Sequence, residues 1–149
     1  MSLKKLFSKL FIRSKAPSSS DAQFPKDGIL WHEWNDATRK LIADRNRPVL
    51  LFVANQDGMV WPFLRGVFQE MPLNAKLREL LNGYFIGLLM KGGEVPEYFR
   101  DLGAGGRFNI AILSPAGLTP MATIDPSKGK PKEIVGTILK VLENLQKTY

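Results

Sequence analysis

Cysteine is absent from this chain of 149 residues, and histidine occurs once, as His32. Thiol–disulfide exchange needs a thiolate, so the chain cannot carry out this reaction with its own side chains. The same absence excludes disulfides, iron–sulfur clusters and zinc sites with cysteine ligands. A single histidine provides no histidine cluster for a metal ion. We therefore predict neither a metal site nor a bound cofactor.

Long hydrophobic runs are also missing. The longest ones, Val49–Ala54 and Tyr84–Met90, have the length of a β-strand, whereas a membrane-spanning helix needs roughly 18 apolar residues or more. The sequence therefore predicts a protein that is not integral to a membrane. Its 44% hydrophobic and 23% charged residues are ordinary for a globular protein, and its length suits one domain.

Acidic residues are missing from positions 1–20, which hold five of the 21 basic residues. The rest of the chain has 16 basic and 14 acidic residues, so most of the net charge of +7 belongs to the N-terminal tail. The body is too nearly neutral to indicate nucleic-acid binding. In the tail only Phe7 and Phe11 could stack on bases. We do not expect nucleic acid as a partner.

Residues 1–13 have the pattern of a basic amphipathic helix, with apolar side chains at i, i+3, i+4, i+7 and i+8. A short helix of this composition can bind an anionic membrane surface or a protein partner. Residues 14–28, rich in serine and proline, are expected to be a flexible linker to a domain over 29–149. The candidate docking residues are Leu3, Lys4, Lys5, Leu6, Phe7, Lys9, Leu10, Phe11 and Arg13.

Two other interpretations of the tail stay open. Residues 1–20 also resemble a mitochondrial presequence, because they are basic, carry hydroxyl groups and contain no acid. The tail could equally be disordered, or dock on the core of its own domain. The predicted location is cytoplasmic and peripheral at a membrane, with the mitochondrial matrix as the alternative if residues 1–20 are a presequence.

From residue 29 onward the hydrophobic pattern predicts alternating helices and strands. A first helix would bury Trp31, Trp34, Ala37, Leu41 and Ile42 and end near Asn46–Pro48, with His32 in a structural role near its start. The further elements are a strand at Val49–Ala54, a helix from Trp61 that breaks near Met71–Pro72 and resumes from Asn74 to Gly83, a strand at Tyr84–Met90, a short helix around Pro96–Leu102, a hairpin of 109–114 with 121–125, and a helix over about 132–147. This αβαβ-then-ββα order matches a thioredoxin-like α/β fold, with a central mixed β-sheet flanked by helices.

Several short motifs support this fold. The chain resembles the thioredoxin-like domain of the spermatogenesis-associated protein 20 type over roughly residues 30–125. The resemblance does not extend to the large helical domain that follows in full-length members of that family. The motifs that carry it are Trp31-His32-Glu33-Trp34 with Ala37, then Arg47-Pro48-Val49-Leu50-Leu51-Phe52, then Gly105-Gly106-Arg107-Phe108-Asn109-Ile110-Ala111-Ile112-Leu113-Ser114-Pro115, with Pro120 in register.

The redox apparatus of such a domain is replaced in this sequence. On the thioredoxin pattern, Asp57-Gly58-Met59-Val60 occupies the Cys-x-x-Cys positions, and Phe108 stands where the cis-proline would be. A cis bond before a residue other than proline costs about 3–4 kcal/mol, so we expect a trans bond before Phe108. Both halves of the redox and peptide-binding site are therefore lost together.

The overwritten site is the main candidate for function. We expect Asp57 to be a turn or helix-capping carboxylate, and Met59, Val60 and Trp61 to be either core or an interaction surface. The loop between the strand and this helix should face the loop before the hairpin, so these residues should share one rim with Arg107 and Phe108. The protein-binding candidates are Asp57, Gly58, Met59, Val60, Trp61, Arg107 and Phe108.

The sequence predicts a binding protein rather than an enzyme. We expect a redox-inactive thioredoxin-like protein that acts as an adaptor, assembly factor or accessory subunit. Its partners would be another protein or a protein complex and, through the tail, an anionic membrane surface. The alternative is a thioredoxin-fold enzyme with non-thiol chemistry, such as glutathione-dependent transfer.

Overall fold

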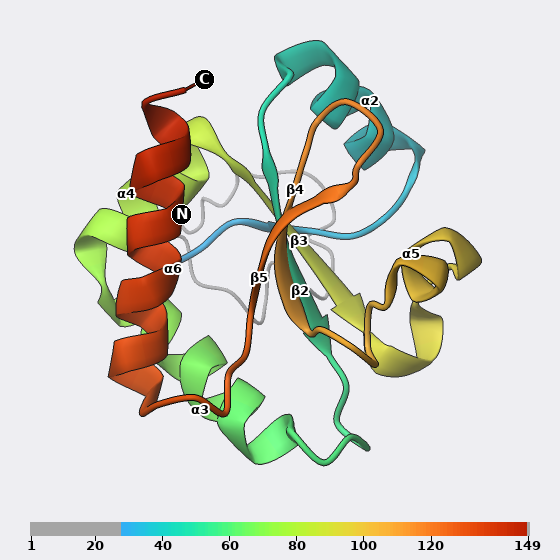
Figure 1. The fold of residues 1–149 in the computed structure, drawn as a ribbon. Helices are drawn as coiled ribbons and strands as arrows, with labels where there is room; N and C mark the ends of the chain where they lie inside the picture. Colours follow the sequence, from blue (N-terminus) through green and yellow to red (C-terminus); the bar gives the residue numbers. More distant parts are fainter. Residues whose placement is uncertain (1–27, 149) are drawn as a thin grey trace, which may run out of the picture.

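Five strands form one mixed β-sheet in the computed structural model, which describes residues 28–148 (Figure 1). The strands lie in the order β1-β3-β2-β4-β5. β1 (Trp31–His32), β3 (Ile86–Lys91) and β2 (Val49–Ala54) are parallel, and β4 (Ile110–Leu113) and β5 (Pro120–Ile124) add an antiparallel hairpin. The predicted α/β class with a central mixed sheet is confirmed. The tail helix predicted over 1–13 and all but the last residue of the linker lie outside the described residues.

Helices cover both faces of the sheet (Figure 1). α3 (Trp61–Glu70), α4 (Ala75–Tyr84) and α6 (Pro131–Gln146) pack on one face, and α2 (Asp36–Arg45) and α5 (Glu97–Leu102) pack on the other. Side chains of β2 alternate between the two hydrophobic clusters, with Phe52 in the first and Val53 in the second. β2 is apolar along its whole length because both of its faces are buried.

The helix boundaries follow from local sequence signals. Asn35 accepts a hydrogen bond from the backbone N–H of Thr38 at 2.8 Å and so caps the start of α2. Asn46 ends the same helix in a left-handed conformation with φ of 52°. The chain breaks at the 3₁₀ helix η2 (Met71–Leu73), and Asn74 then caps α4 as predicted. No helix within residues 28–148 is long and apolar enough to cross a membrane.

The predicted first helix is wrong at its N-terminal half. Trp31 belongs to β1, and α2 begins only at Asp36. Trp31 packs against Phe52 and Phe68, with ring centroids 5.9 and 5.8 Å away, whereas Trp34 packs against Phe99 on the other side of the sheet. The two tryptophans therefore do not share a helix face. Ala37, also expected to be buried, is exposed.

The remaining boundaries differ from the prediction by a few residues. Tyr84 is the last residue of α4 rather than the first of a strand, and β3 begins at Ile86. In α6, the residues predicted to be core are buried, except that Leu145 is only partly buried. His32, expected near a helix start, lies in the edge strand β1.

Candidate functional site

Three loops meet at the end of the sheet where β2 and β3 finish. Asn55, directly after β2, donates a hydrogen bond from Nδ2 to the backbone oxygen of Gly105 at 3.4 Å. After β3 the chain passes so close that a Cβ added at Gly92 would lie 2.7 Å from Oδ1 of Asn55. Asn55 thus joins the loops that follow β2, follow β3 and precede β4. Sequence reasoning missed this residue, although an asparagine straight after a buried strand was a signal for it.

Met59 and Phe63 are the exposed apolar side chains at this end. Met59 is 96% exposed in the turn before α3, and Phe63, on the first turn of that helix, is 46% exposed. Val60 and Trp61 are partly buried and pack against the core on the α3, α4 and α6 face. The sequence predicted that Met59, Val60 and Trp61 are either core or an interaction surface. The structure divides them, with Met59 at the surface and Val60 and Trp61 against the core.

Asp57 and Gly58 form the turn that leads into α3. The backbone N–H of Gly58 donates to the carbonyl oxygen of Asn55 at 3.1 Å, and Asp57 is exposed within this turn. The helix begins after Val60 without a side-chain capping bond. Of the two roles expected for Asp57, the structure therefore shows the turn and not the cap.

Arg107 and Phe108 differ in exposure. Arg107 is exposed. Its side chain lies close to Gly103, since a Cβ added at Gly103 would be 3.2 Å from the Cβ of Arg107. Phe108 is only 8% exposed and belongs to the cluster on the α2 and α5 face. No peptide bond within residues 28–148 is cis, so the predicted trans bond before Phe108 is confirmed. The structure thus places Arg107, but not Phe108, where a partner could touch it.

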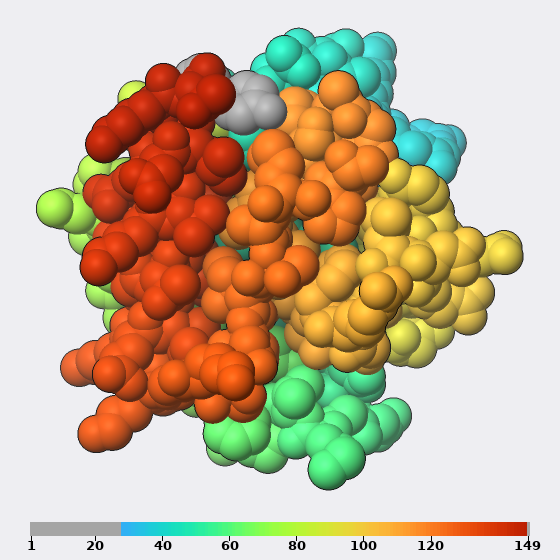
Figure 2. All heavy atoms as spheres, in the orientation of Figure 1, coloured from blue at the N-terminus to red at the C-terminus, as the bar shows by residue number. Residues whose placement is uncertain are grey.

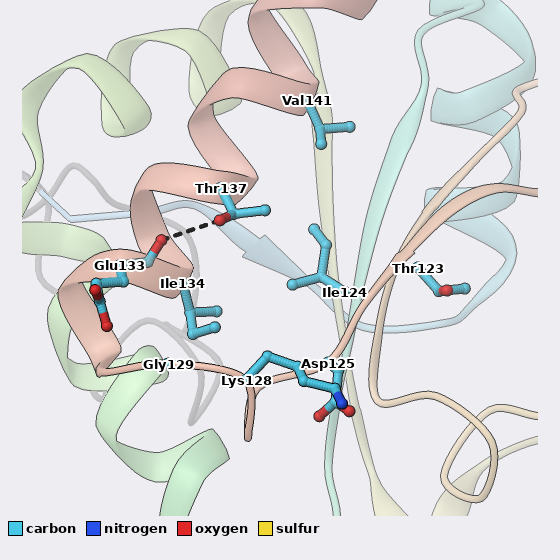
Figure 3. Close-up of a pocket in the computed structure, with 9 residues that line it drawn as sticks. All are labelled: Thr123, Ile124, Asp125, Lys128, Gly129, Glu133, Ile134, Thr137 and Val141. Atoms are coloured by element: carbon cyan, nitrogen blue, oxygen red, sulfur yellow. Dashed lines mark hydrogen bonds between the residues drawn. The ribbon is translucent and has the colours of Figure 1, made fainter.

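A groove between β5 and α6 offers a second concave surface (Figure 3). Its volume is about 340 Å³, and Ile124, Ile134 and Val141 point into it. Figure 2 shows α6 and the β4–β5 hairpin lying side by side on this face of the molecule. In the sequence, only the lysines that precede α6 mark the position of this groove.

The carboxylates of this groove are already engaged in local bonds. Asp125 accepts hydrogen bonds from the hydroxyl and the backbone N–H of Ser127, at 2.6 and 2.9 Å, and these bonds lower the pKa of its carboxyl group. Glu133 accepts from the backbone N–H of Lys130 at 2.7 Å in a capping box at the start of α6. Asp125 and Glu133 therefore have structural roles in the turn and the helix start that they stabilise.

His32, a half-buried residue of β1, has a shifted pKa. Burial lowers the pKa of its imidazole, and the charge of Arg45 lowers it further. Within residues 28–148, no group of three or more His, Cys, Asp or Glu side chains could hold a metal ion.

No protein-family model matches the chain, and no curated protein matches it significantly.

Proposed function

We propose that this chain is a thioredoxin-like binding protein without redox activity, and that it recruits another protein through the end of the sheet where β2 meets α3. The observation that carries the proposal is Met59. It stands among the four positions that would hold Cys-x-x-Cys, and it is 96% exposed. The positions that hold reactive thiols in a thioredoxin-like domain thus present an apolar side chain to solvent here.

The sheet supports the fold part of this proposal. Three parallel strands followed by an antiparallel hairpin, with helices on both faces, is the arrangement expected of a thioredoxin-like domain. The strand-loop-helix unit of β2 and α3 holds the overwritten positions at the start of α3. Kinship with the spermatogenesis-associated protein 20 type rests on the sequence motifs and stays a prediction.

The chemistry of this end suits a protein partner. Methionine adapts its shape to a partner, and Met, aromatic residues and Arg are enriched at protein interfaces. Met59 and Phe63 provide exposed apolar surface, and the exposed Arg107 lies in the loop region that Asn55 ties to the same end. A central apolar contact with a cation at its edge is the composition typical of binding hot spots.

A thioredoxin-fold enzyme with glutathione-dependent chemistry is the alternative function. General acid–base chemistry needs a positioned titratable pair, and Asp57 makes no hydrogen bond or ion pair with any of residues 28–148. Two assays separate the alternatives. Glutathione conjugation of a generic electrophile should not exceed the buffer rate, and insulin reduction should likewise stay at the control rate. Turnover that persists after contaminating enzymes are removed would favour the enzyme.

Partner capture tests the binding proposal directly. The full chain carrying Met59→Asp and Phe63→Asp should lose proteins that the unchanged chain retains. Leu73→Asp is the matched control, because Leu73 is 71% exposed but lies in η2, beyond the far end of α3. With a purified captured partner, the double variant should bind at least about 30-fold more weakly, which corresponds to a hot-spot loss of about 2 kcal/mol. Equal capture by all three chains would overturn the proposal.

A further inference from the structure

The opposite end of the sheet, where β2 and β3 begin, contains a small cavity of about 200 Å³. Pro48 and Phe85, the residues immediately before these two strands, line it together with Arg45, Asn46, Arg47, Tyr84 and Gln146. The lining residues come from the C-terminal ends of α2, α4 and α6 and from the segments just before β2 and β3. Drug-sized ligand sites have volumes of about 300 to 1,000 Å³. This cavity is therefore sized for a small group.

Hydrogen-bond donors dominate the lining of this cavity. It has two guanidinium groups, a phenol and two side-chain amides, those of Asn46 and Gln146, and no carboxylate. No hydrogen bond or ion pair to any of residues 28–148 engages the side chain of Arg45, Arg47, Tyr84 or Gln146. Arg47 is only partly exposed, and no acidic side chain of residues 28–148 forms an ion pair with its guanidinium group.

The dipole of α2 accounts for the position of one of the two arginines. Arg45 is in the last turn of α2, where a cation stabilises the negative end of the helix. Arg47 lies beyond that helix, past the left-handed Asn46, so the helix does not account for it. The positive charge of Arg45 also affects a neighbouring residue, because it lowers the pKa of His32.

We propose that this cavity binds a phosphate group, with Arg45 and Arg47 as its charged donors and Tyr84 and Gln146 as neutral ones. The guanidinium group is planar and matches phosphate oxygens with two parallel N–H donors. An anion in the cavity supplies the counter-charge that the described residues do not provide. The phosphate can come from a lipid headgroup or from a free phosphate.

The attachment point of the tail lies at this same end. The side chain of Asn82 donates to the backbone oxygen of Gly28 at 3.0 Å and accepts from the N–H of Leu30 at 2.9 Å. Asn82 precedes Tyr84 by two residues on the last turn of α4. Gly28, the first described residue, therefore lies at the same end of the molecule as the cavity. Leu30 and Tyr84 at this end are 54% and 55% exposed.

Inorganic phosphate is the first probe. Titrated into the isotope-labelled full chain at constant ionic strength, it should shift the amide resonances of Arg45, Arg47, Tyr84 and Gln146 in a saturable manner. Arg47→Gln should weaken this binding at least tenfold. Arg47→Lys should fall between the two, because it keeps the charge and loses the planar fork.

Arg65→Gln is the matched control, since Arg65 is an exposed arginine on α3 with no partner within residues 28–148. It should bind phosphate like the unchanged chain. The melting temperature of each variant identifies any loss of folding. Shifts no larger than those caused by equal sodium chloride, or equal weakening by Arg65→Gln, would overturn the proposal.

Vesicles distinguish the two sources of phosphate. The probes are vesicles of phosphatidylcholine alone and of phosphatidylcholine with phosphatidic acid. If the source is lipid, Arg47→Gln should reduce co-sedimentation with the acidic vesicles more than Arg65→Gln does. If it is a free phosphate, the two variants should sediment equally while Arg47→Gln alone loses the phosphate titration. The Met59→Asp and Phe63→Asp chain should keep the phosphate titration, so this proposal and the protein-binding proposal can fail independently.

Discussion

The end of the sheet where β2 and β3 finish exposes apolar side chains, whereas the end where they begin exposes cationic ones. At the first end, Met59 in the turn before α3 and Phe63 on the first turn of α3 are exposed. At the second end Arg45 and Arg47 line a small cavity among the C-terminal ends of three helices. The same sheet thus supports two surfaces that suit different partners.

Helix polarity explains part of this difference. The C-terminal ends of α2, α4 and α6 carry partial negative charge and favour nearby cations such as Arg45. The start of α3 carries partial positive charge, yet its first turn contains no acidic residue and no side-chain cap. The backbone N–H groups of Trp61 and Phe63 donate to the carbonyl oxygens of Gly58 and Val60, and Pro62 has no N–H, so this helix start presents side chains rather than free backbone donors. Helix polarity therefore accounts for the cation Arg45 at one end, whereas the other end is distinguished by its exposed apolar side chains.

Removal of residues 1–20 should have the largest effect and should show whether the cationic end binds membranes alone. Each cation near an anionic surface contributes about 1 kcal/mol, so the loss of five should weaken vesicle binding by at least about a hundredfold. Co-sedimentation of the full chain and of a chain that begins at Asp21 measures this difference. Phe7→Glu should produce much of the same loss, and salt should weaken what remains. Equal sedimentation of the two chains would end the membrane interpretation of the tail.

Trp61→Ala should separate core from surface at the apolar end. Trp61 is partly buried against the core cluster, so its loss should lower the free energy of unfolding by about 2 kcal/mol, below the cost of about 3–5 for a fully buried tryptophan. Met59→Ala should change the same free energy by less than about 0.5 kcal/mol, since Met59 is almost fully exposed. Denaturant titration measures both. A Trp61→Ala chain as stable as the unchanged one would show that the tryptophan belongs to the binding surface.

Gly103→Ala should disturb the loop that carries Arg107. Gly103 has φ of 110°, which other residues rarely adopt, and an added Cβ would lie 3.2 Å from the side chain of Arg107. The expected loss of stability is about 1–2 kcal/mol. Gly93→Ala is the control, because it has no positive φ and nothing lies within 4 Å of its added Cβ. If the two alanine variants melt at the same temperature, the loop does not depend on the backbone conformation of Gly103.

Sequence reasoning worked where the pattern was local. The apolar run of β2, the proline in the first turn of α3 and the Asn74 cap are each visible in a few neighbouring residues. β1 was missed because two residues are too few to show a period, and because two tryptophans three positions apart imitate a helix face. Long-range packing against Phe52 outweighed that local pattern.

The candidate sites were only partly predictable for the same reason. Met59 and Arg107 were found from their place in a recognised pattern, but their exposure and the burial of Phe108 depend on the packing of both faces. The cationic cavity gave no sequence signal. Its lining comes from separate segments around residues 45–48, 84–85 and 146, which only the folded chain brings together.

His32 offers the smallest effect and a direct measure of charge at the cationic end. Burial and then Arg45 lower its folded-state pKa below the usual value of 6.5, so the unfolded chain binds a proton more readily than the folded one. The stability due to neutral His32 is therefore present above about pH 6.5 and is lost as the pH falls through the folded pKa. His32→Gln should flatten this part of the stability profile.

Arg45→Gln should raise the His32 pKa only part of the way to 6.5, because the contribution of burial, which is the larger one, remains. Saturating phosphate should raise the pKa in the unchanged chain for the same electrostatic reason, since an anion beside Arg45 offsets its charge. The imidazole resonance is unambiguous, as the chain has a single histidine. Phosphate should have little effect on the His32 pKa in the Arg45→Gln chain. An equal rise with and without Arg45 would mean that the anion acts on the imidazole itself, and that the two ends of the sheet differ less in charge than their side chains indicate.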